Sequence, residues 1–250
     1  AAFEVMVGNI LSHIYNDGKV DNVEIAKMAQ FAEREFFGKP CGLMDQMACA
    51  VGGFITIDFK DPSSPVIEKL DFDLSGNGYA LCIVDTGGNH ADLNADYASV
   101  PGEMKAVAAH FSKSVLRECS IPEVVAAIPE LREKVGDRAI MRAIHFLCEN
   151  DRVEAQVKAL KKGNMKAFLD GVFASGDSSY KYLQNVYTTK CVEEQGLSLA
   201  LCLTELKLAG TGAAWRVHGG GFAGTIQAFV PVSLAKDYAL YMEKVFGEGS

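Results

Sequence analysis

The position of the strand patterns is the feature that most constrains how this chain can fold. Residues with helical spacing fill almost the whole stretch from 97 to 208, whereas runs typical of β-strands lie on either side of it. Those runs occupy residues 54–59, 66–73, 79–86 and 225–230. Helices and strands in this mixed order predict an α+β fold in two lobes. The Ser75–Gly78 turn predicts the boundary between them, with domains at 1–77 and 78–250.

Turn and cap signals place the elements within each lobe. The first two strand runs flank a turn with two prolines and predict a hairpin, and the third run is typical of a central strand. The predicted helices cover residues 1–15, 21–37, 42–51, 97–118, 123–134 and 138–160. We expect the 42–51 helix to be buried. We also expect a break at Pro101 in the fourth helix, because proline removes a backbone donor.

The balance of charge argues against one class of partner. The chain carries 24 Lys and Arg against 32 Asp and Glu, a net charge of −8, whereas nucleic-acid binders normally present a basic patch. No apolar run approaches the roughly 18 residues of a membrane span, and the N-terminus lacks the basic start of a signal peptide. Seven cysteines without a C-x-x-C pair are typical of reduced, buried thiols, and the five histidines lack zinc-site spacing. These features predict a soluble cytoplasmic protein that binds neither nucleic acid nor membrane.

One acidic residue stands among apolar neighbours. Asp45 lies beside Leu43 and Met44 at the start of the 42–51 helix, and burying a carboxylate is costly unless a partner compensates. The free N–H groups and the dipole of a helix N-terminus can supply that compensation. Asp45 could then orient or deprotonate a substrate hydroxyl inside a cleft. The alternative is a capping or salt-bridged aspartate, and the spacing alone favours neither.

Three further candidates have plain structural interpretations when each is taken alone. Cys41 has no histidine near it in sequence, which favours a buried structural thiol over a nucleophile. The 219–221 triplet lacks the spacing of a dinucleotide or Walker loop, so it is either a tight turn or a place where a ligand approaches backbone. Glu33 has charged neighbours and is typical of a solvated surface acid.

Two motifs together carry a resemblance to a known family. With CGLMDQ at 41–46 and GGGFAG at 219–224, the sequence resembles the galactokinases of the GHMP small-molecule kinase family over essentially all 250 residues. The resemblance implies a two-lobed GHMP kinase architecture, in which part of an N-terminal mixed-sheet lobe precedes a C-terminal lobe of helices on an antiparallel sheet. It also implies transfer of the γ-phosphoryl group of ATP to the C1 hydroxyl of galactose, in a site between the lobes.

The resemblance assigns the sugar-binding roles to three residues of this chain. Asp45 matches the active-site aspartate, described as the base for the sugar hydroxyl or as its electrostatic partner. Gly42 matches a glycine whose backbone touches the sugar. Tyr97, seven residues after His90 as in the family, matches the tyrosine that hydrogen-bonds the sugar from the second lobe.

The resemblance also implies the cofactors ATP and Mg²⁺. Glu33 matches the acid associated with Mg²⁺, which replaces the surface interpretation given above. Ala1 belongs to the remaining tail of the family's phosphate-loop motif. The third family motif, near the phosphate loop, matches Gly219, Gly220 and Gly221. A metal-bound acid and a sugar-aligning aspartate suit phosphoryl transfer, which depends on positioning and charge neutralisation.

A final group of expectations concerns what this chain lacks. The family's first motif and most of its phosphate loop would precede residue 1, and a final strand would follow Ser250. We therefore expect a fragment that is inactive by itself. His218 and Ala223 depart from the family pattern, which has Thr or Ser at the first position and often Gly at the second.

Other functions remain open from the sequence. A kinase for a related sugar, N-acetylgalactosamine or galacturonate, would use the same residues, because these sugars differ at positions read partly by the first motif. A non-catalytic protein that binds galactose and ATP to regulate a partner is a second alternative, and an inert folding remnant is a third. The presence of both Asp45 and Glu33 favours an enzyme.

Overall fold

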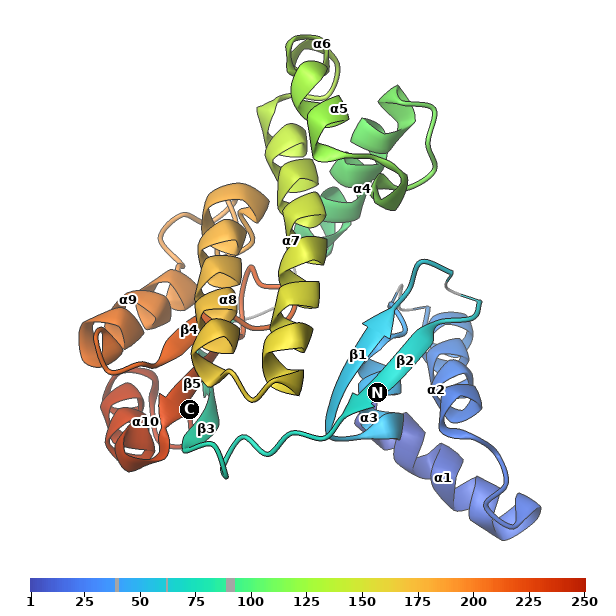
Figure 1. Ribbon diagram of the computed structural model, residues 1–250, viewed down its shortest axis with the longest axis vertical. Helices are drawn as coiled ribbons and strands as arrows, with labels where there is room; N and C mark the ends of the chain where they lie inside the picture. The colour runs from blue at the N-terminus through green and yellow to red at the C-terminus, as the bar shows by residue number, and fades with distance from the viewer. Residues whose placement is uncertain (39–40, 62, 89–92) are drawn as a thin grey trace. The chain divides into compact units, whose positions relative to one another are not determined.

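The computed structural model describes residues 1–38, 41–61, 63–88 and 93–250, which form two compact units (Figure 1). Unit 1 is Ala1–Phe72 and unit 2 is Asp73–Ser250. The sequence predicted the boundary after residue 77. Residues 73–77 therefore belong to the first domain in the prediction and to unit 2 in the structure. His90, which the sequence interpretation names, lies outside the described residues.

Unit 1 combines helices with one antiparallel hairpin. Its elements are α1 (Ala2–Asn16), α2 (Asn22–Phe31), the π-helical turn η1 (Ala32–Phe36), α3 (Met44–Val51), β1 (Phe54–Asp58) and β2 (Val66–Leu70). The Asp21 carboxylate caps α2 by accepting a hydrogen bond from the Glu24 backbone N–H at 3.0 Å. Phe54 pairs with Leu70 across the hairpin, which confirms the predicted pairing of the two strand runs.

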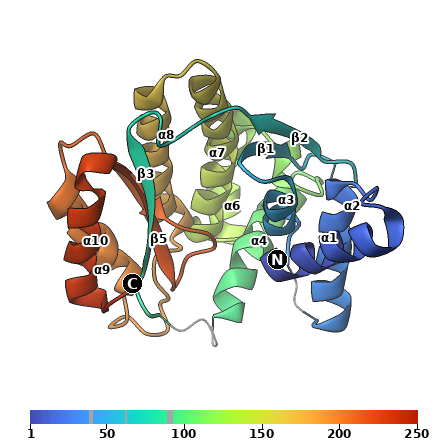
Figure 2. The ribbon, with the colours of Figure 1, turned by 90° about the horizontal axis from the view of Figure 1, so that it is seen from below.

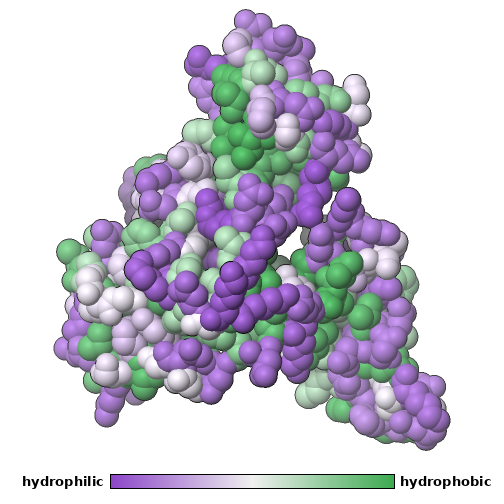
Figure 3. Space-filling model, in the orientation of Figure 1, coloured by the Kyte–Doolittle hydropathy of each residue, from purple (hydrophilic) through white to green (hydrophobic). Residues whose placement is uncertain are grey.

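Unit 1 leaves many apolar side chains at its surface, as the green areas over the small unit in Figure 3 show. Its helical core contains Val5, Ile25 and Ala29. The prediction of a buried 42–51 helix is wrong, because Gln46 and Met47 are the buried residues of α3 and most of the others are exposed. Within the described residues of unit 1 the expected mixed sheet is represented by the antiparallel β1–β2 pair alone.

Unit 2 places most of its helices between its first and second strands. Its elements are β3 (Tyr79–Asp85), α4 (Asn94–His110), η2 (Leu116–Glu118), α5 (Ile121–Ala126), α6 (Ile128–Lys134), α7 (Asp137–Lys161), α8 (Met165–Ser178), η3 (Ser179–Leu183), α9 (Gly196–Leu208), β4 (Ala214–Val217), β5 (Thr225–Pro231) and α10 (Val232–Phe246). The three strands form an antiparallel sheet, as expected for the C-terminal lobe.

The sheet of unit 2 has the order β3-β5-β4, so β5 and not β3 is the central strand. The prediction of a central strand at 79–86 is therefore wrong. The apolar run suggested a strand buried on both faces, but Leu81 and Ile83 of β3 are exposed although they are apolar. Figure 2 shows α9 and α10 on one side of the sheet and α7 and α8 on the other.

Two helix predictions also fail at prolines. α4 continues through Pro101, and its Val107 and Ala108 pack in one core with Ala139 and Ala143 of α7. This tertiary packing offsets the cost of an internal proline, about 3 kcal/mol. The predicted 123–134 helix is instead divided into α5 and α6, and a proline stands in the first turn of α6, where no backbone donor is needed.

The cysteines and the apolar helices complete the description. All seven cysteines are free thiols, as predicted, but Cys49 and Cys202 are exposed and Cys119 is the one in the buried class. Their burial was therefore predicted too broadly. Among the helices that the structure describes, none combines the length and the hydropathy that a membrane crossing requires.

Candidate active site

The glycine loop, residues 218–224, connects β4 to β5 in unit 2. It is closed by a hydrogen bond from the His218 backbone N–H to the Thr225 carbonyl at 3.1 Å. Gly221 has a φ of 80°, and a Cβ added there would lie 1.9 Å from the Asn185 carbonyl oxygen. Only glycine fits at this position, because the conformation is left-handed and a neighbouring backbone occupies the space of a side chain.

Tyr97 holds this loop from α4. Its hydroxyl donates a hydrogen bond to the Gly221 carbonyl at 2.8 Å, between residues 124 positions apart. Its ring meets the Phe222 ring edge-on at 5.5 Å. Burial raises the pKa of Tyr97 above its ordinary value, and the phenol is protonated and able to donate at neutral pH. The structure therefore brings together Tyr97 and the glycine triplet, two of the predicted site features.

Asn185 is a residue of this loop site that sequence reasoning missed. Its side-chain amide donates to the Gly220 carbonyl at 3.1 Å, and its backbone carbonyl accepts from the Phe222 N–H at 2.5 Å. The side chain is buried, and its Oδ1 atom has no hydrogen-bond partner among the described residues. A lone asparagine after a helical stretch carries no pattern, so no signal in the sequence singles it out.

A second cluster lies in unit 1 around Glu33. This side chain is 6% exposed, so the interpretation as a solvated surface acid is wrong. Its Oε1 atom accepts from Gln46 Nε2 at 3.0 Å and lies 3.0 Å from the amino nitrogen of Ala1. Glu4 Oε2 lies 2.7 Å from the same nitrogen. The structure thus gathers Ala1, Glu4, Glu33 and Gln46 from three different helical segments.

The chemistry of this cluster suits a hard divalent cation. Glu33 offers a carboxylate, and Gln46 Oε1 is a buried oxygen with no hydrogen-bond partner in the described part of the chain. The described residues contain no group of three or more His, Cys, Asp or Glu side chains arranged for a metal. Mg²⁺ commonly uses one or two protein oxygens, with water and substrate phosphates as its other ligands. The donor set at Glu33 therefore fits Mg²⁺.

Asp45 and Gly42 lie near the start of α3. Asp45 is in the first turn of the helix, where the dipole favours an anion, but it is exposed and not buried among its apolar neighbours. The N-cap residue of α3 is Leu43, and no side-chain cap hydrogen bond to it is found in the described part of the chain. Gly42 is exposed, and an added Cβ there would meet no described residue within 4 Å. Both residues belong to unit 1, whereas Tyr97 and the glycine triplet belong to unit 2.

Comparison with solved structures identifies the fold. The galactokinase of Lactococcus lactis complexed with galactose superposes with a TM-score of 0.76 at 23% identity, covering 98% of this chain and 61% of that one. A mevalonate kinase of L. major gives 0.60 at 16% identity, covering 98% and 60%. Residues 1–53 match the family model described as the GHMP kinases N terminal domain.

The chain has the GHMP kinase fold.

Curated sequence relatives point to one branch of this fold. The galactokinase of Streptomyces coelicolor is 29% identical over 228 residues, covering 90% of this chain and 55% of that protein. The galactokinase of Clostridium tetani is 30% identical over 239 residues, covering 93% and 57%. The resemblance to galactokinases is therefore confirmed, and the chain spans little more than half the length of these relatives.

Proposed function

We propose that the protein containing this chain is an ATP-dependent kinase that phosphorylates the C1 hydroxyl of galactose. The observation that carries the proposal is the hydrogen bond from the Tyr97 hydroxyl to Gly221, because it joins two residues that are far apart in sequence and to which the resemblance assigns roles in the site. The galactokinase names of the curated relatives support the choice of sugar.

In unit 2, the proposed role of the loop is to position groups for phosphoryl transfer. The Gly221 carbonyl fixes the Tyr97 hydroxyl, whose oxygen lone pairs remain able to accept a hydrogen bond from a sugar hydroxyl. Gly219, Gly220 and Gly221 are the proposed phosphate contacts of the loop. A phosphate can approach the backbone most closely at Gly219, where no described residue would meet an added Cβ, whereas Tyr97 and Asn185 fill that space at Gly220 and Gly221. Such positioning supplies most of the catalysis in phosphoryl transfer.

In unit 1, the proposed roles concern charge. Asp45 accepts the proton of the C1 hydroxyl or stabilises the developing positive charge on it, and the Gly42 backbone contacts the sugar. Glu33, supported by the Gln46 amide, is the proposed Mg²⁺ ligand, and Ala1 is the proposed contact of the phosphate-binding segment. Mg²⁺, when bound, would neutralise charge on the phosphates of ATP.

The test is an assay of ADP formation by the complete protein with ATP, Mg²⁺ and a panel of galactose, N-acetylgalactosamine and galacturonate. We expect turnover with galactose to exceed that with the other sugars. Asp45→Asn should lower kcat by about 100-fold or more, the usual contribution of a positioned acid or base.

A matched pair of variants tests the metal role. Glu33→Gln should raise the Mg²⁺ concentration needed for half-maximal rate, whereas Glu35→Gln, an exposed acid of the same π-helical turn, should not. Absence of turnover with galactose, or faster turnover with another sugar, would contradict the proposed function. An equal Mg²⁺ requirement in the two variants would contradict the metal role of Glu33 but would leave the proposed sugar kinase function standing.

A further inference from the structure

The most deeply buried charged side chain of unit 2 lies outside the site described above. Arg142 on α7 is 1% exposed and is the largest fully buried side chain among the described residues. A buried guanidinium requires partners for its donors, since an unpaired buried charge is strongly destabilising. Its partners therefore show what it holds in place.

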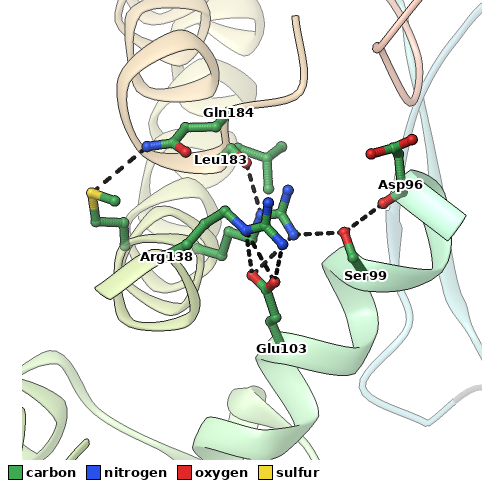
Figure 4. Close-up of polar contacts among 8 residues, drawn as sticks. Asp96, Ser99, Glu103, Arg138, Leu183 and Gln184 are labelled. Carbon is green, nitrogen blue, oxygen red and sulfur yellow. Dashed lines mark hydrogen bonds and ion pairs between the residues drawn. The ribbon is translucent and has the colours of Figure 1, made fainter. Parts of the chain in front are cut away.

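The donors of Arg142 reach two separate segments. Figure 4 labels the partners on both, Ser99 and Glu103 on α4 and Leu183 at the end of η3. Toward α4, its Nη1 atom donates to Ser99 Oγ at 2.8 Å and to Glu103 Oε2 at 2.9 Å. Toward the end of η3, its Nε atom donates to the Leu183 carbonyl at 2.9 Å. The planar guanidinium fixes the angle between these contacts, as a lysine ammonium does not. One side chain thus ties α4 and the end of η3 to α7.

Each of these segments leads within two residues to a group that holds the glycine loop. Ser99 is two residues after Tyr97, which donates to the Gly221 carbonyl. Ser99 also donates to the Asp96 carbonyl, so its hydroxyl is fixed on both sides. Leu183 is two residues before Asn185, whose amide donates to the Gly220 carbonyl. The link between Leu183 and Asn185 is Gln184, which has a left-handed φ of 56°.

We propose that Arg142 is a positioning residue for the glycine loop, because it fixes both of the segments from which Tyr97 and Asn185 grip that loop. The loop keeps its shape only when the Tyr97 hydroxyl and the Asn185 amide keep their relative positions, since each binds a different carbonyl of the triplet. The structural part of this inference is independent of the reaction, and its kinetic part rests on the proposed function.

Arg138 supplies a matched control. It lies one helical turn before Arg142 on α7 and binds the same carboxylate, with its Nε atom 3.0 Å from Glu103 Oε1. Its side chain is 44% exposed, and no hydrogen bond from it to Ser99 or Leu183 is found among the described residues. Removing Arg138 therefore tests the loss of a Glu103 ion pair without the loss of the two-segment link.

The first experiment measures amide hydrogen exchange by mass spectrometry in Arg142→Met, Arg142→Lys and Arg138→Met variants. Loss of the hydrogen bonds to a charged group should speed exchange in peptides covering 183–188 and 219–224 by about tenfold or more in Arg142→Met. Arg142→Lys should show a smaller increase, and Arg138→Met none. Peptides of α9 and α10 serve as the internal reference and should be unchanged in all three variants.

The second experiment measures steady-state kinetics of the same variants in the complete protein. We expect Arg142→Met to lower kcat/KM for the sugar about tenfold, Arg142→Lys to recover part of it, and Arg138→Met to match the wild type. Exchange that is unchanged at 219–224, or that rises equally across α9 and α10, would overturn the positioning role. A protein without sugar turnover would refute the proposed function, while the exchange result would still decide the role of Arg142.

Discussion

Replacing Gly221 by alanine is the sharpest test of how the glycine loop is built. The residue has a φ of 80°, and its new Cβ would lie 1.9 Å from the Asn185 carbonyl oxygen and 2.7 Å from its side-chain nitrogen. Backbone at that distance cannot move aside as a flexible side chain can. The loop must therefore shift and give up its hydrogen bonds to Tyr97 and Asn185.

The size of the effect follows from two contributions. A left-handed backbone conformation costs a non-glycine residue about 1–2 kcal/mol, and each hydrogen bond that is lost contributes about 0.5–1.5 kcal/mol. With three bonds at stake, we expect Gly221→Ala to lower the free energy of unfolding of unit 2 by about 3–5 kcal/mol. Gly219→Ala is the matched control, because its φ is 63° but an added Cβ would meet none of the described residues within 4 Å. Gly219→Ala should lower the free energy of unfolding only by the cost of the left-handed conformation.

Urea unfolding followed by tryptophan fluorescence measures this difference. Trp215 is the single tryptophan of the chain and lies in β4, next to the loop, so its signal reports on unit 2. At a denaturant slope of about 2 kcal/mol per molar urea, the midpoints of the two alanine variants should differ by about 1 M. Equal midpoints would refute the packing argument, because the strain contribution is common to both variants.

Two further predictions use other residues of unit 2. Tyr97→Phe removes the hydroxyl that donates to Gly221 but keeps the ring against Phe222. The free energy of unfolding, measured by thermal unfolding, should therefore fall by about 1 kcal/mol. An unchanged free energy of unfolding would contradict a stabilising role of this hydrogen bond. His145 is buried against Ser178, and desolvation lowers its pKa below 6.5. As the pH decreases, the unfolded state therefore takes up a proton on this histidine before the folded state does. The free energy of unfolding should fall as the pH decreases from about 6.5 toward the folded pKa. His145→Gln should reduce this fall, measured as the change in urea midpoint between pH 7 and 5.5.

The local parts of the fold were predictable because their causes are local. Asp21 caps α2 through the backbone three residues ahead, and the β1–β2 hairpin follows from two strand runs joined by a turn. The glycine triplet forms a turn beside a strand, as its composition indicates. The cap and the hairpin need no distant residue in order to form, whereas the detailed shape of the glycine loop depends on Tyr97 and Asn185.

The site was predictable only in part. The resemblance selected Tyr97 and the glycine triplet, which the structure brings together, and it corrected the interpretation of Glu33, which is buried. A buried position inside a cleft was one of two interpretations of Asp45, and the residue is exposed.

The sequence by itself determined where helices, turns and strand-like runs occur, because propensity and capping act over a few residues. Tertiary structure alone decided that β3 is an edge strand, that α4 continues through Pro101 and that Glu33 is buried. It also decided that Arg142 and Asn185 reach the segments around the glycine loop. These outcomes depend on contacts between residues distant in sequence, and on burial free energies that exceed local preference.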